Sequence, residues 1–220
     1  GYTASIDNAL YTEADFKFTG KAKVNGTDAG TYNMGLAANQ FENTNSNFAN
    51  VEFSVTDGEL VVNPRTVVLT SESGSKPYDG IALTKPVVTA TGEGFVNGEV
   101  TDVKATGSVL NVSEGEVINT IVYTAGTNFK ASNYSITKNE GKLSITASTE
   151  KVVVTITGNK KNELYDGTEK TAKGYTVNTN NELYTEADFK FSGTAKANGT
   201  DAGTYNMGLA ANQFENANGN

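Results

Sequence analysis

Carboxylates are the only side chains in this sequence that could carry acid–base chemistry. The 220-residue chain has no histidine and no cysteine, which excludes a Ser-His-Asp triad, a cysteine nucleophile and a disulfide. Two acidic pairs, Glu13 with Asp15 and Glu186 with Asp188, could suggest glycoside hydrolysis. Each pair lacks a partner carboxylate for the second face of the sugar. We therefore expect no catalytic residue and no enzyme.

Metal binding is restricted by the same composition. Zinc and most transition metals need imidazole or thiolate ligands, so only an oxygen-ligated ion such as Ca²⁺ stays open. Asp28 and Asp57 lie near glycine turns, but no Asp-x-(Asp/Asn)-x-(Asp/Asn)-Gly loop is present. Solvated acidic turns are the commoner explanation, and we predict no metal site and no cofactor.

A Lys-Asn isopeptide crosslink is a further possibility for a domain of this composition. Lys104 could pair with Asn119 or with Asn133. No strand pattern singles out one pair, so the crosslink stays an open alternative that intact mass would decide.

The charge of the chain opposes binding to nucleic acid. The net charge is −8, whereas phosphate recognition needs clustered lysine and arginine. Arg65 is the single arginine. No apolar run approaches the roughly 20 residues that cross a bilayer, and no signal peptide is visible. We expect neither a nucleic-acid partner nor membrane insertion of this part of the chain.

Two Tyr-Asp-Gly sequences are the candidate ligand-binding turns. Tyr78 and Asp79 precede Gly80, and Tyr165 and Asp166 precede Gly167. These four Tyr and Asp side chains could be presented to a ligand. The alternative is that Asp and Gly serve the turn and the tyrosine ring packs in the core.

The elements that would position these turns are β-strands. The chain contains 30 Thr, 26 Asn and 23 Gly, residues suited to strands and to the turns between them. In the middle of the chain we predict strands near 66–72, 86–91, 99–106, 117–124, 133–138 and 142–147. Imperfect alternation within 100–105 and 118–123 indicates a bulge in each.

Short sequence signals predict the connections. The Asn-Gly pairs at 25–26, 97–98 and 198–199 indicate hairpins or tight turns. Residues 10–16 and 183–189 are expected to begin with one helical turn, capped by Thr12 and Thr185 respectively. The sequence Asp-Ala-Gly-Thr-Tyr, at 28–32 and 201–205, fits a tyrosine corner, in which the hydroxyl bonds to nearby backbone.

An internal repeat organises the whole chain. A shift of 173 residues aligns 1–47 with 174–220 without a gap, and 37 of the 47 positions are identical. Such identity indicates recent duplication of a long module. A weaker similarity, from Val67 to Gly80 against Val153 to Gly167, divides this period into two units of about 85 residues, an ordinary domain size.

Three repeat units follow from these alignments. Residues 1–64 form a partial unit that lacks its opening strand, residues 65–148 form a complete unit, and residues 149–220 form a partial unit that lacks its closing hairpin. A missing strand leaves unpaired backbone groups along a sheet edge. We therefore expect strand exchange, in which the opening strand of one chain completes the first unit of a neighbour.

The repeat resembles a known group of families. The segments Lys76–Gly80 and Glu163–Gly167 look like the signature of the YDG and MBG repeat families of bacterial surface proteins and adhesins. Further similarity lies in Thr106-Gly107-Ser108, Asn119-Thr120-Ile121 and Gly141-x-Leu143-x-Ile145. The resemblance covers essentially the whole chain. It implies an elongated array of small β-sandwich domains, immunoglobulin-like or β-grasp-like, with no catalytic residues to carry over.

This resemblance implies a location and a role. We expect a secreted, extracellular protein of the bacterial cell surface that acts as a non-enzymatic stalk or spacer and in adhesion. Its partners would then be host or environmental glycans or proteins. The alternative is a carbohydrate- or mucin-binding module that uses exposed Tyr and Asn, although no tryptophan is available as a stacking platform.

Overall fold

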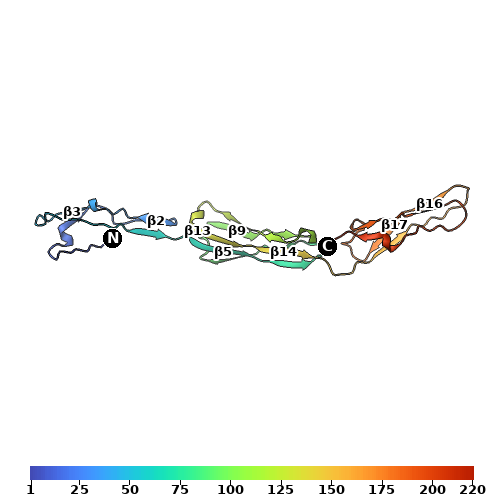
Figure 1. The fold of residues 1–220 in the computed structure, drawn as a ribbon, viewed down its shortest axis with the longest axis horizontal. Coiled ribbons are helices and arrows are strands. Elements are labelled where there is room, and N and C mark those ends of the chain that lie inside the picture. The colour runs from blue at the N-terminus through green and yellow to red at the C-terminus, as the bar shows by residue number, and fades with distance from the viewer. The chain divides into compact units, whose positions relative to one another are not determined.

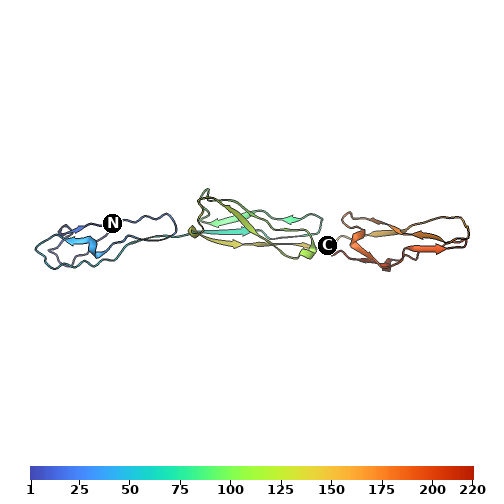
Figure 2. The ribbon, with the colours of Figure 1, turned by 90° about the horizontal axis from the view of Figure 1, so that it is seen from above.

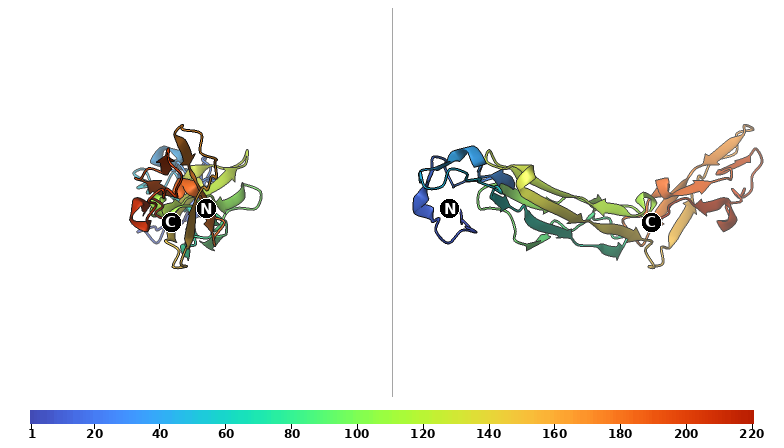
Figure 3. Two further views of the ribbon diagram at one scale, coloured as in Figure 1. Left: turned by 90° about the vertical axis from the view of Figure 1, so that its right-hand side faces the viewer. Right: turned by 60° about the vertical axis from the view of Figure 1, so that its left-hand side comes forward.

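The protein is all-β. A computed structural model describes all 220 residues and contains twenty strands and six 3-10 helices of three residues each. The short coils of these helices are visible among the strands, and no longer helix appears in any view (Figure 2 and Figure 3). None of the helices has the length and apolar character needed to span a bilayer.

Contacts between Cα atoms divide the chain into two compact units. Unit 1 comprises Gly1–Thr70, Val88–Lys104 and Ile121–Asn139, and unit 2 comprises Ser71–Val87, Ala105–Thr120 and Glu140–Asn220. Both units are therefore built from segments that lie far apart in the sequence.

Unit 1 contains nine strands and three 3-10 helices. In chain order these elements are η1 (Glu13–Asp15), β1 (Phe16–Phe18), β2 (Gly30–Asn33), η2 (Ala38–Gln40), β3 (Phe41–Asn43), β4 (Glu59–Val62), β5 (Arg65–Ser71), β8 (Val88–Gly92), β9 (Val100–Ala105), β12 (Ile121–Ala125), η4 (Ala131–Asn133) and β13 (Tyr134–Asn139).

The sheets of unit 1 are small. Strand β1 pairs with β3 and β2 pairs with β4, both antiparallel. Strand β5 lies at the centre of a three-stranded sheet between β13 and β8, and its ladder with β13 is parallel (Figure 1). The buried side chains of Val67, Leu69, Ile121 and Tyr134 form the core around this sheet. Alternate residues of β5 face inward, as period-two patterning predicts.

Unit 2 contains eleven strands and three 3-10 helices. These elements are β6 (Gly74–Pro77), β7 (Leu83–Thr84), β10 (Ser108–Val109), η3 (Val112–Glu114), β11 (Val117–Asn119), β14 (Gly141–Thr146), β15 (Val154–Gly158), β16 (Lys170–Lys173), β17 (Tyr175–Thr179), η5 (Glu186–Asp188), β18 (Phe189–Phe191), β19 (Lys196–Gly199), η6 (Ala211–Gln213) and β20 (Phe214–Asn216).

Strand β14 is central in unit 2. It lies between β11, to which it is antiparallel, and β6, to which it is parallel. Its side chains of Leu143 and Ile145 are buried with Val109, and Tyr78 packs against this cluster. Further along the chain, β15 pairs with β17, β16 with β19 and β18 with β20, all antiparallel.

Most of the predicted strands are confirmed. The segments predicted near 66–72, 86–91, 99–106, 133–138 and 142–147 correspond to β5, β8, β9, β13 and β14. The predicted strand 117–124 is interrupted at Thr120 and forms β11 and β12. In β9 the irregularity falls at Asp102, which adopts a φ of 51°, so that Thr101 and Asp102 are both exposed.

Two of the three Asn-Gly predictions are wrong. Gly98 has a φ of 82° in a tight turn that Glu99 N–H closes onto the Val96 carbonyl, as predicted. Gly26 lies in an extended segment without a turn, and Gly199 lies within β19. At both positions a Cβ would lie within 2.3 Å of a tyrosine ring, Tyr32 or Tyr205. Glycine is therefore required by the close packing of a ring and not by a hairpin.

The two repeat copies pair differently although their sequences are nearly identical. Residues 196–199 form β19 against β16, whereas the matching residues 23–26 form no strand. Conversely, residues 30–33 form β2 against β4, whereas 203–206 form no strand. Whether these segments become strands is therefore decided by the presence of a neighbouring strand.

Candidate functional site

The first Tyr-Asp-Gly turn is a self-contained Asx turn. The Asp79 carboxylate accepts a hydrogen bond from Ile81 N–H at 2.9 Å and one from Lys76 Nζ at 2.6 Å. The lysine contact, followed by the backbone N–H, holds the pKa of Asp79 below its usual range. Gly80 has a φ of 76°, which favours glycine because a Cβ is strained there. The Tyr78 ring is half-buried against the core of unit 2.

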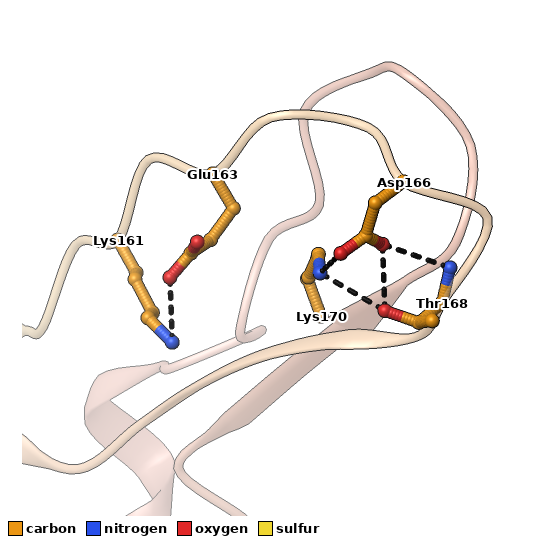
Figure 4. Close-up of polar contacts among 5 residues, drawn as sticks. All are labelled: Lys161, Glu163, Asp166, Thr168 and Lys170. Carbon is orange, nitrogen blue, oxygen red and sulfur yellow. Dashed lines mark hydrogen bonds and ion pairs between the residues drawn. The ribbon is translucent and has the colours of Figure 1, made fainter.

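The second turn is similar in its hydrogen bonds but differs in exposure. The Asp166 carboxylate accepts hydrogen bonds from Thr168 N–H at 3.0 Å, from the Thr168 hydroxyl at 2.6 Å and from Lys170 Nζ (Figure 4). The Lys170 contact, followed by those of Thr168, lowers the pKa of Asp166 far below its usual range. Tyr165 is 66% exposed. The sequence predicts equivalent roles for Tyr78 and Tyr165, but Tyr165 is mostly exposed whereas Tyr78 is half-buried.

The four predicted residues do not form one site. Tyr78 lies in a hollow of about 680 Å³ together with Leu183, Tyr184 and Phe214. Tyr165 lies in a different groove of about 860 Å³, lined by residues 158–165, 170–172 and 197–209. No group of three or more His, Cys, Asp and Glu side chains comes close enough to hold a metal ion. The carboxylates of both turns accept hydrogen bonds from their own turns.

The aspartates of the duplicated acidic pairs have a structural use. The predicted helical turn forms at η1, where Asp15 N–H bonds to the Thr12 carbonyl at 3.0 Å. Thr12 is the N-cap residue of this turn, as predicted, and the Asp15 carboxylate contributes to the cap by accepting from Thr12 N–H at 2.7 Å and from its hydroxyl at 2.8 Å. Asp188 and Thr185 repeat the same contacts at 2.7 and 2.9 Å. These hydrogen bonds lower the pKa of both aspartates.

The two aspartates considered as calcium ligands are also engaged. Asp28 accepts from Lys130 Nζ at 2.6 Å and from Asn133 Nδ2 at 3.0 Å, and these contacts lower its pKa. Asp57 accepts from the backbone N–H groups of Leu36 at 2.7 Å, Gly35 at 2.9 Å and Gly58 at 2.9 Å. Three N–H donors around one carboxylate make this a loop anchor, and they lower its pKa.

A buried polar cluster around Asn119 escaped the sequence analysis. The side chain of Asn119 is fully buried. Its Oδ1 accepts from Gly107 N–H at 3.0 Å, and its Nδ2 donates to the carbonyls of Glu72 at 3.0 Å and Lys85 at 2.8 Å. The amide considered for a crosslink to lysine is therefore fully used in hydrogen bonds to backbone.

Ser71 completes this polar cluster. Its hydroxyl donates to the Asn119 carbonyl at 2.6 Å and accepts from Gly141 N–H at 3.0 Å. A Cβ at Gly107 or Gly141 would lie within 2.6 Å of backbone atoms. The short motifs that carry the family resemblance, at 106–108, 119–121 and 141–145, therefore meet in one hydrogen-bonded cluster.

Tyrosine hydroxyls fix the corners of the repeat copies. The Tyr32 hydroxyl donates to the Asp28 carbonyl at 2.8 Å, and Tyr205 donates to Asp201 at 3.2 Å, so both predicted tyrosine corners are confirmed. A second pair of tyrosine hydroxyl contacts was not predicted from the sequence. The Tyr11 hydroxyl is shared between the Asp15 carbonyl and Asn43 Oδ1, and Tyr184 makes the same contacts to Asp188 and Asn216. The signal was available, because both tyrosines lie in the duplicated Leu-Tyr-Thr-Glu sequence.

The chain was compared with known proteins. No family model, no curated protein and no solved structure matches it. Its role therefore has to be inferred from its own residues.

Proposed function

We propose that this chain is a non-enzymatic repeat region of a bacterial cell-surface protein, located outside the cell and acting as a stalk or spacer. In this proposal the three repeat units are small β-sandwiches in tandem. Extra copies then lengthen the stalk without adding a new activity. Each unit stabilises itself and its immediate neighbours.

The proposal rests on the contacts that the duplicated polar side chains make. Tyr11, Asp15 and Tyr32 recur as Tyr184, Asp188 and Tyr205, and every one of these side chains hydrogen-bonds to backbone within five residues. These are contacts that hold a fold together. A duplicated binding site would instead leave the shared hydroxyl and carboxylate groups without partners inside the fold and free to bind a ligand.

Composition supports the same role. The chain contains no cysteine and so needs no disulfide to fold outside the cell. A net charge of −8 favours solubility and mutual repulsion of repeated copies.

The spacer role can be tested by small-angle X-ray scattering. The chain would be compared with a longer one in which residues 48–220 occur twice, so that one 173-residue period is added. A spacer predicts that the maximum dimension grows by a fixed increment with each added period. An unchanged maximum dimension would contradict it. Protease treatment of intact cells that produce the full-length protein would test the surface location.

Carbohydrate binding is the second candidate, and the 66% exposure of Tyr165 favours it. A glycan array probed with the whole chain would detect such binding. Tyr165→Ala should abolish any signal, and Tyr78→Ala should alter it only by loosening the core. Absence of binding across a broad array would leave the spacer role alone.

A further inference from the structure

The Asn-Gly dipeptide, which occurs four times in this chain, carries chemistry of its own. The side-chain amide of asparagine can be attacked by the backbone nitrogen of the next residue, and glycine leaves that nitrogen unshielded because it has no side chain. Three pairs lie at 25–26, 97–98 and 198–199, and the fourth is Asn218-Gly219. The structure places these identical dipeptides in different surroundings, so their reactivities should differ.

The pair Asn97-Gly98 lies at the tip of the turn between β8 and β9. Both residues are exposed. The turn is closed by the Glu99 N–H and the Val96 carbonyl at 3.1 Å, and neither Asn97 nor Gly98 makes a hydrogen bond of its own. The Gly98 nitrogen can therefore approach the Asn97 side chain by rotation of the peptide group between them, without breaking a hydrogen bond of either residue.

Two of the other pairs are restrained by their neighbours. The Tyr32 ring lies within 2.3 Å of the position that a Cβ at Gly26 would occupy, so a rotation at this extended segment is opposed by the ring. Asn198 and Gly199 belong to β19 and are paired with β16. The Asn198 Oδ1 also accepts a hydrogen bond from the Thr171 hydroxyl at 3.0 Å. Rotation there would break the ladder between the two strands.

The fourth pair is restrained through its side chain. Asn218 Nδ2 donates to the Asp188 carboxylate at 2.7 Å, and Asn218 Oδ1 accepts from Asn220 N–H at 2.8 Å. Both ends of the amide that would react are therefore already engaged. Reaction at any of these three pairs must first break hydrogen bonds or displace a ring, and reaction at 97–98 needs neither.

We propose that Asn97 is the principal site of spontaneous deamidation in this chain. The Gly98 nitrogen forms a bond to Asn97 Cγ and loses its proton, while the Cγ–Nδ2 bond breaks and ammonia leaves, which closes a cyclic imide. Water then adds to one of the two imide carbonyls and opens the ring. One opening gives aspartate, and the other gives isoaspartate, in which the main chain runs through Cβ and Cγ. Water is consumed, ammonia is released and position 97 gains a negative charge.

The isoaspartate product changes the contacts on both sides of the turn. The buried Tyr134 hydroxyl accepts from Val96 N–H at 3.0 Å and donates to the Glu99 carboxylate at 2.6 Å, so one side chain holds both ends of the turn. Isoaspartate adds one methylene to the main chain between these two ends. Because hydrogen bonds weaken steeply away from their preferred geometry, the modification should loosen Val96 and Glu99 from the core residue Tyr134.

The proposal is tested with the unmodified 220-residue chain, held at neutral and at mildly alkaline pH and sampled over time by peptide mapping with mass spectrometry. Deamidation raises the mass because OH replaces NH2, and chromatography separates aspartate from isoaspartate peptides. The peptide that contains Asn97 should gain mass first. Peptides that contain Asn25, Asn198 and Asn218 should react at least about 5-fold more slowly, since each pair must first lose a contact that restrains it.

Two controls separate the effect of the structure from that of the dipeptide. In guanidinium chloride the chain is unfolded, and the four pairs should react at similar rates. Asn97→Gln keeps an amide at this exposed position but would have to close a larger ring, so it should abolish the early mass gain. Amide hydrogens of Val96 and Glu99 should exchange faster in the aged original chain and stay unchanged in the aged variant.

Two results would overturn the proposal. One is that Asn97 reacts no faster than the other three asparagines in the folded chain. The other is that the same ranking persists in guanidinium chloride, because the surroundings of the pairs would then not be its cause. Either result would leave the spacer role untouched, since that role does not depend on the turn between β8 and β9.

Discussion

Replacement of Asn119 by alanine should destabilise its part of the chain strongly. The change removes the amide that contacts Gly107 N–H at 3.0 Å and the carbonyls of Glu72 and Lys85 at 3.0 and 2.8 Å. A buried group left without a partner costs about 1–3 kcal/mol. The Gly107 N–H is buried and bears the full cost, whereas the carbonyls are only partly buried. We expect a loss of about 3–5 kcal/mol in the free energy of unfolding.

Hydrogen exchange followed by mass spectrometry across a urea series would measure this loss segment by segment. With a urea dependence of about 2 kcal/mol per molar, the midpoint for peptides from 65–148 should fall by about 2 M. Peptides from 1–47 serve as an internal control. Asn139→Ala, at an exposed position of β13, is the matched variant and should change stability by less than about 0.5 kcal/mol.

A second variant sharpens the same prediction. In the last repeat unit, Gly158 and Met207 occupy the positions that correspond to Ser71 and Asn119, and a Cβ at Gly158 would lie 3.3 Å from the Met207 sulfur. The double variant Ser71→Gly with Asn119→Met should therefore lose less stability than the sum of the single variants. A urea midpoint for Asn119→Ala within about 0.3 M of that of the original chain would contradict the prediction. It would show that the backbone groups left without Asn119 cost little free energy.

Three further outcomes are expected. Tyr32→Phe should cost about 1 kcal/mol through loss of one hydrogen bond, seen as faster exchange across 28–33. Gly199→Ala should cost about 1–3 kcal/mol, because its Cβ would lie 2.0 Å from the Tyr205 ring; Gly219→Ala, in open space, should be neutral in the same urea series. The pKa of Asp57 is lowered by folding, so its contribution to stability is complete above the unfolded pKa of about 4 and is lost as the pH falls through the folded pKa. Between pH 7 and pH 3 the urea midpoint should fall less steeply for Asp57→Ala than for the original chain. An equal fall in the two chains would contradict the role of Asp57 as a loop anchor.

Regular alternation made the strands of the middle repeat predictable. Val67 and Leu69 alternate with outward residues in β5, and the inward positions of β14 follow the same rule. The tyrosine corners were predictable because their geometry is local, joining residues four apart. Both features depend on short stretches of sequence, which is why the sequence sufficed.

The Asn-Gly pairs show where sequence reasoning fails. The pairs at 25–26 and 198–199 share residues and yet differ in structure, because only the second has a strand beside it. A local propensity cannot report on a neighbour that is distant in sequence. The Asn119 cluster could not be predicted for a related reason, because it joins backbone groups of residues 72, 85 and 107 to one side chain. The short motifs at 106–108, 119–121 and 141–145 were visible in the sequence, but nothing in them indicated that Gly107, Asn119 and Gly141 meet.

The parallel ladders β5–β13 and β6–β14 have a mechanical consequence. In each ladder the strand nearer the N-terminus runs in the same direction as the strand nearer the C-terminus, so tension on the polypeptide pulls the paired strands in opposite directions along their length. All hydrogen bonds of a ladder then resist together in shear, instead of opening one after another. The short antiparallel ladders β1–β3 and β18–β20 have only three paired positions each. In a single-molecule pulling experiment, residues 65–146 should therefore be the last to yield.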